Sequence, residues 1–308
     1  MFDRLIHADW SINPVKRWAA SATHKDGRWQ IATPLPVGAV PRFLADAFTV
    51  GEKERVLLGF DFPIGLPSAY GALTGFASFQ EALPALGSRE PWAGFFDVCE
   101  RGEDVSLYRP FYPQVSRKGA SPASLVSGIG IGDTGKLLRI CERRTAARQA
   151  ACCLFWTLGG NQVGKAAIAG WREVIRPALA QGAKLWPFEG PLAELGAQPG
   201  VVLAETYPAE IYAMVGARFL PGESKRQPAD RARKAPALFK WAEQHAVVFS
   251  THLMSTVADG FGTSATGEDM YDAFLGLLGM IEVAEGRRAE MTETHAAVLN
   301  WEGWILGR

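Results

Sequence analysis

Five acidic residues stand at the ends of separate apolar segments of this chain. Three of them close short apolar runs that are typical of buried strands, and these are Asp9, Asp61 and Glu205. The other two, Asp269 and Asp272, open a segment with helical spacing. A carboxylate at the end of a buried strand costs folding free energy unless a cation or a hydrogen-bond donor meets it. The repetition of such positions indicates a shared purpose, and divalent metal binding is the chemistry that we expect.

Carboxylate oxygens suit that chemistry. Mg²⁺ prefers hard oxygen ligands and keeps several waters, so a few protein carboxylates are enough to hold it. Hydrolysis of a phosphodiester by two metal ions needs carboxylates that flank or bridge ions about 3.5–4 Å apart. Asp269 and Asp272 are three positions apart, so they share a helical face and could point at one ion. We therefore predict a site for two divalent ions, Mg²⁺ or Mn²⁺.

The acids also have structural alternatives. Asp9 could simply terminate a strand, and Asp61 could cap the turn at 63–65. Glu205 could interact with the dipole of the helix that follows it. Asp269 stands where acidic residues are favoured in the first turn of any helix. The sequence leaves the structural and the functional interpretation open at each position.

The hydrophobic pattern predicts the elements that must position these acids. Alternating or continuous apolar runs predict strands, and apolar residues at helical spacing predict helices. In the first part of the chain the pattern predicts strand, strand, strand, helix and strand, at 5–9, 16–23, 28–32, 41–50 and 55–61. Strand order resumes much later, with a strand, a helix and a closing amphipathic helix at 201–205, 208–215 and 267–285.

Residues 68–200 interrupt this order. They are rich in Pro, Gly and aromatic residues, and they predict helices at 136–156 and 162–179. We interpret 1–308 as a single α/β domain in which 68–200 is an insertion, partly helical, that covers the carboxyl edge of the sheet.

Short motifs around the acids resemble those of domain-of-unknown-function family 429, whose members are described as predicted nucleases of the RNase H fold. The matching motifs are Asp9-Trp10-Ser11, Asp61-Phe62-Pro63-Ile64-Gly65-Leu66-Pro67, Glu205-Thr206-Tyr207-Pro208 and Asp272-Ala273-Phe274-Leu275. Residues 155–165 are similar to a signature of one branch of that family. The resemblance implies an RNase H-like mixed sheet, a three-strand antiparallel meander plus parallel strands, flanked by helices.

The resemblance also implies roles for the acids. Asp9 would lie at the centre and reach both metal ions, while Asp61 and Glu205 would complete the ligation. Asp272, with Asp269, would hold the second ion, in a spacing similar to the last-helix pair of the Holliday-junction resolvases of this superfamily. The implied catalytic residues are Asp9, Asp61, Glu205 and Asp272, and Asp269 is a further metal ligand.

Polar and basic residues of the insertion are candidates for substrate binding: Gln162, Lys165, Arg143 and Arg144. Gln162 and Lys165 lie three apart on one predicted helical face. The two arginines would extend, with Arg139, a basic stripe along the predicted helix at 136–156, which could contact phosphate. A solvated helix face is the alternative. A second basic stretch at 223–234 reads more as plain surface.

Composition bounds the class of protein. The chain has 308 residues, 48% of them hydrophobic, which is enough for a large core. Lys and Arg number 32 and so do Asp and Glu, so no global field draws the chain to nucleic acid or to an anionic membrane. No segment approaches the roughly 20 apolar residues of a membrane span. The four cysteines have no metal-ligand spacing, and we expect reduced thiols in a cytoplasmic protein.

We therefore predict a metal-dependent phosphodiester hydrolase, a nuclease with nucleic acid as its partner. The alternative is a protein that binds a small phosphorylated substrate or nucleotide, or transfers its phosphate, because the superfamily includes sugar kinases and actin-like ATPases. The charge balance and the insertion favour a small substrate. The oligomeric state and the choice between DNA and RNA do not follow from the sequence.

Overall fold

The computed structural model describes residues 2–115, 119–144, 149–158 and 163–308. The chain forms two compact units. The first comprises 1–61, 178–290 and 305–307, and the second comprises 62–177, 291–304 and 308. The expected insertion at 68–200 overlaps most of the second unit, but 178–200 belong to the first.

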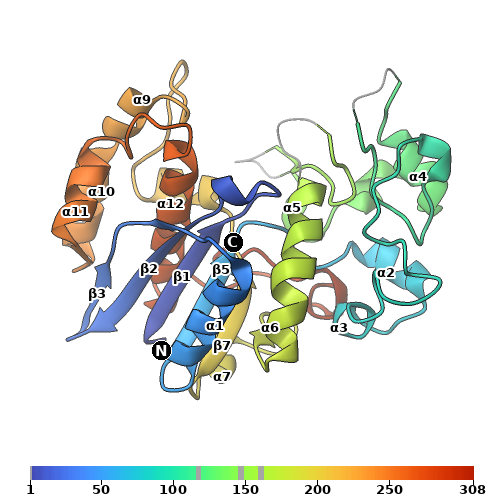
Figure 1. Ribbon diagram of the computed structural model, residues 1–308, viewed down its shortest axis with the longest axis horizontal. Helices are drawn as coiled ribbons and strands as arrows, with labels where there is room; N and C mark the ends of the chain where they lie inside the picture. Colours follow the sequence, from blue (N-terminus) through green and yellow to red (C-terminus); the bar gives the residue numbers. More distant parts are fainter. Residues whose placement is uncertain (1, 116–118, 145–148, 159–162) are drawn as a thin grey trace. The chain divides into compact units, whose positions relative to one another are not determined.

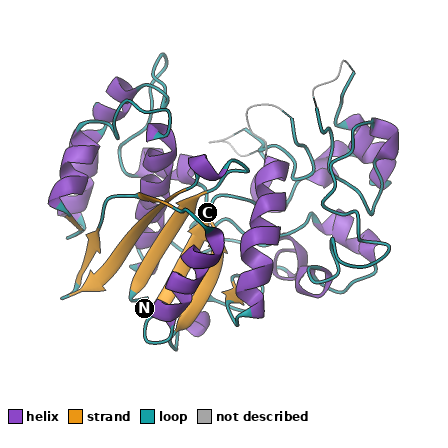
Figure 2. Ribbon diagram, viewed as in Figure 1, coloured by secondary structure: helices purple, strands orange, loops and turns teal. Residues whose placement is uncertain are grey.

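The first unit is built on a mixed sheet flanked by helices (Figures 1 and 2). Its strands are β1 (Arg4–Asp9), β2 (Trp18–Lys25), β3 (Arg28–Ile31), β4 (Leu35–Pro36), β5 (Arg55–Phe60), β6 (Lys184–Leu185), β7 (Gly200–Glu205) and β8 (Val248–Phe249). The order across the sheet is β6-β7-β5-β1-β2-β3-β8, with β4 beside β2. β1, β2 and β3 form an antiparallel meander, and β5 and β7 lie parallel to β1. The strands predicted near the site are confirmed.

Helices complete the first unit: η1 (Pro14–Lys16), α1 (Val40–Gly51), α7 (Leu192–Leu195), η6 (Pro208–Glu210), α8 (Ile211–Met214), α9 (Pro228–Ala232), α10 (Ala235–Gln244), α11 (Thr251–Ala258) and α12 (Gly267–Ala284). The helix predicted at 267–285 is therefore confirmed as α12. It packs on β1 and β2, whereas α1 packs on the other face, where a β-carbon at Gly51 would come within 2.9 Å of Val201.

Glycine lets α12 lie directly on the sheet. A β-carbon at Gly276 would overlap the imidazole of His7 in β1. At Gly59 of β5 a β-carbon would come within 2.6 Å of the Met280 sulfur of α12. The close approach fixes the amino-terminal turns of α12 over the ends of β1 and β5.

His7 ties these elements together from inside the core. It is fully buried, and its ring lies 2.9 Å from the Ala273 carbonyl oxygen through Nδ1 and 2.7 Å from Thr206 Oγ1 through Nε2. Burial lowers the pKa of His7 to about 4, so the ring is neutral at pH 7. A neutral ring has one N–H, and only Nδ1–H can serve the carbonyl, so Nε2 accepts from the Thr206 hydroxyl. β1, α12 and the end of β7 are thus joined through one side chain.

The second unit consists of helices, turns and irregular segments. Its helical elements are α2 (Ser68–Thr74), α3 (Phe79–Ala82), η2 (Gly102–Asp104), α4 (Ala123–Ile129), η3 (Thr134–Leu137), η4 (Ile140–Glu142), α5 (Val163–Gly170), η5 (Trp171–Ile175) and η7 (Val298–Glu302), while α6 (Arg176–Ala180) crosses the boundary between the units. The core is aromatic, with fully buried rings at Tyr70, Phe79, Phe95, Phe111, Phe155 and Trp171.

The helix predicted at 136–156 is wrong. In its described part the chain forms only the short turns η3 and η4, and the rest is irregular. The reason is Arg139, which is buried in an ion pair with Glu142 at 2.9 Å and donates to the carbonyl oxygens of Ile64 and Glu302. These tertiary hydrogen bonds hold the backbone in a path that helical spacing does not predict. The helix predicted from 162 to 179 forms from residue 163 onward, as α5, η5 and α6.

Across the ranges that the structure describes, no helix is both long enough and apolar enough to pass through a bilayer.

Candidate functional site

Asp9 and Asp61 lie side by side at the carboxyl ends of β1 and β5. The two strands are parallel and pair Ala8 with Phe60, so the next residue on each strand is one of these acids. Side chains alternate along a strand, and His7 and Gly59 face α12, so Asp9 and Asp61, two positions further, face the same side. The two carboxyl groups are hydrogen-bonded to each other.

The backbone beyond β1 orients Asp61. The Trp10 N–H donates to Asp61 Oδ1 at 2.6 Å, across the gap between the two strand ends. The contact fixes one carboxylate oxygen of Asp61, and the same carboxyl group is hydrogen-bonded to Asp9.

The first turns of α12 supply two more acids. Asp269 and Asp272 are buried, with 8% and 6% of their surface exposed. Asp272 accepts a hydrogen bond from the Tyr212 hydroxyl of α8 and forms an ion pair with the Lys225 ammonium. Its two oxygens are therefore met by groups from two different segments.

The pKa values of Asp9, Asp61 and Asp269 reflect burial and the charges of nearby acids. Burial, together with the charges of Asp61 and Asp272, raises the pKa of Asp9 well above its usual range. Burial raises the pKa of Asp61 to about 7, against the opposing hydrogen bond from Trp10. Burial also raises the pKa of Asp269 to about 6, and the nearby Lys16 ammonium opposes this shift. Acids far apart in the sequence thus converge at one place, as the sequence prediction requires.

One oxygen of this group lacks a hydrogen-bond partner. Asp269 Oδ2 is buried and meets no donor among the residues that the structure describes. A buried, unpaired carboxylate oxygen beside other carboxylates is unstable without a cation. The donor set, made only of carboxylate oxygens, fits a hard divalent ion such as Mg²⁺.

The acids are nonetheless not arranged around an ion. Within the described part of the chain, no three His, Cys, Asp or Glu side chains already surround one point as metal ligands would. Asp272 is engaged instead by Tyr212 and Lys225. The carboxylate oxygens suit a metal ion as ligands, but in this structure the Lys225 ammonium is paired with Asp272.

Glu205 lies at the same edge of the sheet but on a different face. It is buried at the end of β7 and pairs with Phe60, whose ring packs against Trp10. Its neighbour Thr206 reaches His7 on the α12 side, so alternation directs the Glu205 side chain to the opposite face. The structure brings together Asp9, Asp61, Asp269 and Asp272, and it sets Glu205 apart from them.

The predicted substrate-binding residues belong to the second unit. Arg143 and Arg144 are exposed and follow η4, so the helical stripe that would have joined them to Arg139 does not exist. Lys165 is half-buried in the first turn of α5. Gln162 lies outside the described residues.

Two site residues escape the sequence analysis. Tyr212 carries no signal of its own, because its role depends on how α8 packs against α12. Lys225 lies in the basic stretch at 223–234, which reads mainly as surface, yet the structure places its ammonium on Asp272. The sequence offered one signal: a group of acids needs a cation, and a lysine of the basic stretch at 223–234 could supply it.

Comparison of the chain with protein-family models, with curated proteins and with solved structures gives no significant match in any of the three. The function therefore has to be argued from the chemistry of the site.

Proposed function

We propose that the chain is a metal-dependent phosphodiester hydrolase, a nuclease of RNase H type. The observation that carries this proposal is the convergence of Asp9, Asp61, Asp269 and Asp272 from three separate segments in a buried cluster. Acids held this close keep their charges only when a cation neutralises them, and otherwise they take up protons, as the raised pKa values of Asp9, Asp61 and Asp269 indicate. Such a cluster is therefore a candidate metal site and a poor structural element.

The order of the elements supports the RNase H assignment. An antiparallel meander of β1, β2 and β3 is followed by strands parallel to β1, and a late helix carries acids to the ends of β1 and β5. The family-429 resemblance includes Asp9, Asp61 and Asp272, which are three of the four clustered acids. Fold order and motif positions thus favour the same site.

The four aspartates would hold the divalent ions, two by our proposal. Bound there, the ions would stabilise negative charge on a phosphate and lower the pKa of a bound water. The chain's own groups prepare the carboxylates: the Trp10 N–H orients Asp61, and the Tyr212 hydroxyl orients Asp272. Burial of the aspartates limits the water around them, which strengthens electrostatic interactions with a charged substrate.

Replacing Asp9 tests the proposal. The Asp9→Asn protein keeps the size of the side chain and removes its negative charge. With short DNA and RNA oligonucleotides and Mn²⁺, we expect the wild-type protein to cleave and Asp9→Asn to be slower by about 100-fold or more. Asp46→Asn is the matched control, because Asp46 is exposed on α1 and lies 3.9 Å from the exposed Arg42. Equal cleavage by wild type and Asp9→Asn, or no Mn²⁺-dependent cleavage by either, would contradict the proposal.

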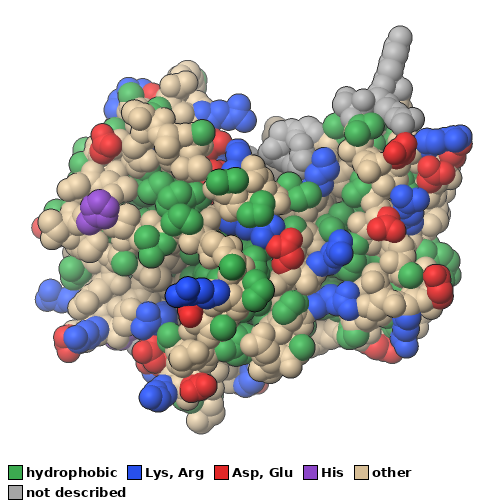
Figure 3. Space-filling model, in the orientation of Figure 1, with side chains coloured by type: hydrophobic (Ala, Val, Ile, Leu, Met, Phe, Trp, Pro, Cys, Tyr) green, Lys and Arg blue, Asp and Glu red, His purple; other side chains and the backbone are tan. Residues whose placement is uncertain are grey.

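A small phosphorylated substrate is the second candidate. The charge balance of 32 against 32 favours it. Acidic and basic side chains are also interspersed on the face drawn in Figure 3. Thermal-shift measurements with nucleotides and sugar phosphates separate the candidates, since stabilisation that needs both ligand and Mg²⁺ supports the small substrate.

A further inference from the structure

The cluster already contains a cation, supplied by the segment between α8 and α9. The Lys225 ammonium pairs with Asp272, and its charge also acts on Asp9, Asp61 and Asp269. Burial lowers the pKa of Lys225, but the hydrogen bond to Asp272 and the charges of Asp272, Asp9 and Glu268 together raise it more, so the ammonium stays charged. One positive group is thus shared by all four aspartates.

The buried Arg231 side chain holds the backbone at Lys225 in place. The Arg231 side chain is 1% exposed and donates to three carbonyl oxygens: Lys225 at 2.5 Å, Gly260 at 2.7 Å and Gly262 at 2.8 Å. A buried guanidinium that serves three loop carbonyls fixes the course of those loops. The carbonyl of Lys225 itself is one of the fixed points.

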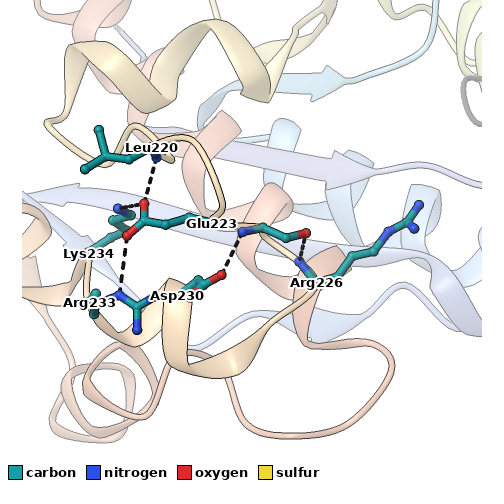
Figure 4. A network of polar contacts seen from close by, with 7 residues as sticks. Leu220, Glu223, Arg226, Asp230, Arg233 and Lys234 are labelled. Carbon is teal, nitrogen blue, oxygen red and sulfur yellow. Dashed lines mark hydrogen bonds and ion pairs between the residues drawn. The ribbon is translucent and has the colours of Figure 1, made fainter.

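A second network anchors the residues on either side of Lys225 (Figure 4). The Glu223 carboxylate accepts from the Leu220 N–H at 2.7 Å and pairs with Arg233 and Lys234. Asp230 accepts from the Ser224 N–H at 2.7 Å. The backbone is therefore held, whereas the Lys225 side chain is partly exposed, at 41% against 8% for Asp272.

We propose that Lys225 is a residue of the active site with two positions: it occupies the place of a cation at Asp272 when no metal is bound, and it contacts the substrate phosphate when a divalent ion takes Asp272. The inference rests on the proposed function. An ammonium and a divalent ion compete for the same carboxylate oxygens, so binding of one displaces the other. A lysine on a flexible four-carbon stem can then turn to a phosphate oxygen while its backbone stays fixed.

The proposal has two consequences of opposite sign. Removal of the ammonium takes away a competitor, so metal should bind more tightly, by about tenfold or more. Removal also takes away a phosphate contact, so turnover should fall, by about 100-fold. A lysine that only supported the fold would weaken metal binding and turnover together.

The experiment compares Lys225→Met with Lys225→Arg and Arg226→Met. Lys225→Arg keeps the charge, and Arg226→Met removes the neighbouring exposed cation, which lies 3.8 Å from Glu268. Mn²⁺ binding is measured by calorimetry without substrate, and cleavage is measured separately. For Lys225→Met we expect tighter Mn²⁺ binding, slower cleavage and, without metal at pH 8, a melting temperature lower by about 2–4 °C that Mn²⁺ restores. The other two variants should bind Mn²⁺ within about twofold of wild type.

The outcomes separate this inference from the proposed function. If wild type binds Mn²⁺ and cleaves while Lys225→Met binds Mn²⁺ no more tightly, the inference is wrong and the proposed function stands. If wild type binds no Mn²⁺ and Asp9→Asn changes nothing, both are wrong. Should Lys225→Met fail to fold, Lys225→Gln replaces it. That variant too must bind Mn²⁺ more tightly and cleave more slowly than wild type.

Discussion

At the residue scale, the clustered aspartates make the metal-free protein sensitive to pH. The pKa of Asp61 is about 7 and that of Asp269 about 6, whereas an unfolded aspartate has a pKa of about 3.9. Between these values the folded protein binds more protons than the unfolded chain does. Folding stability from these groups is therefore complete below pH 4 and is lost as pH rises toward 7.

Asp61→Asn should relieve this loss. The amide keeps an oxygen for the Trp10 N–H but cannot ionise. In the presence of EDTA, we expect Asp61→Asn to unfold with a free energy higher than wild type by on the order of 2 kcal/mol at pH 8, and with little difference at pH 4. Urea denaturation at the two pH values measures this difference in the free energy of unfolding, with Asp46→Asn as the control. A variant that is equally destabilised at both pH values would show that the Asp61 charge is not what strains the site.

These acids could be predicted from the sequence because strand ends carry their own signal. A buried apolar run that stops at an acid marks both the element and its carboxyl end, as at Asp9 and Asp61. The partners of those acids could not be predicted in the same way. Tyr212 and Lys225 reach Asp272 through the tertiary path of α8 and the segment after it. The face of Glu205 depends on a strand register that a single sequence does not fix.

At the scale of elements, the site depends on how closely α12 approaches the sheet. The spacing of apolar residues predicted α12 and the strands, because each of these elements presents a continuous apolar face. The segment at 136–156 could not be predicted, because a buried Arg139 with tertiary carbonyl partners overrides helical spacing. The local sequence pattern determines secondary structure where burial of apolar residues dominates. Where long-range hydrogen bonds dominate, they determine the path of the backbone.

Gly276→Ala tests the approach of α12. The added methyl group would overlap the His7 ring and push the helix away from β1. We expect a loss of about 1–3 kcal/mol in the free energy of unfolding, because overpacking outweighs the gain in helix propensity. Mn²⁺ affinity should fall as well, since Asp269 and Asp272 move with the helix.

Gly94→Ala is the control for that substitution, because among the described residues a β-carbon there comes within 4 Å of Asp97 alone, at 3.6 Å. Chemical denaturation and Mn²⁺ calorimetry give the two readouts. If Gly276→Ala kept both wild-type stability and wild-type affinity, the contact between α12 and β1 would not be what positions the acids.

At the scale of the whole molecule, the residues of the candidate site lie in one unit, and the chain carries no net charge. The four clustered aspartates and Lys225 belong to the first unit, whose sheet and α12 hold them, and the second unit has its own aromatic core. With equal numbers of acidic and basic residues, the recognition of phosphate that we propose would have to come from a few local contacts and not from a long-range field.

The salt dependence of the nucleic-acid binding that we propose would measure how many such contacts there are. The logarithm of affinity for duplex DNA falls with the logarithm of salt concentration with a slope of about −0.9 for each phosphate neutralised. For this chain we expect a slope of about −2 to −3, which corresponds to two or three contacts. Fluorescence anisotropy of a labelled oligonucleotide with the Asp9→Asn protein gives the slope without cleavage.

The predicted arginines can be tested in the same titration. If Arg143 and Arg144 contact phosphate, replacing both by methionine should make the slope shallower by about 2, and Lys165→Met by about 1. An unchanged slope would remove them from the site and leave phosphate recognition to the first unit, where Lys16 and Lys225 lie near the acids. A slope of about −6 or steeper would contradict the small number of contacts and would indicate an extended basic surface, despite the balanced charge.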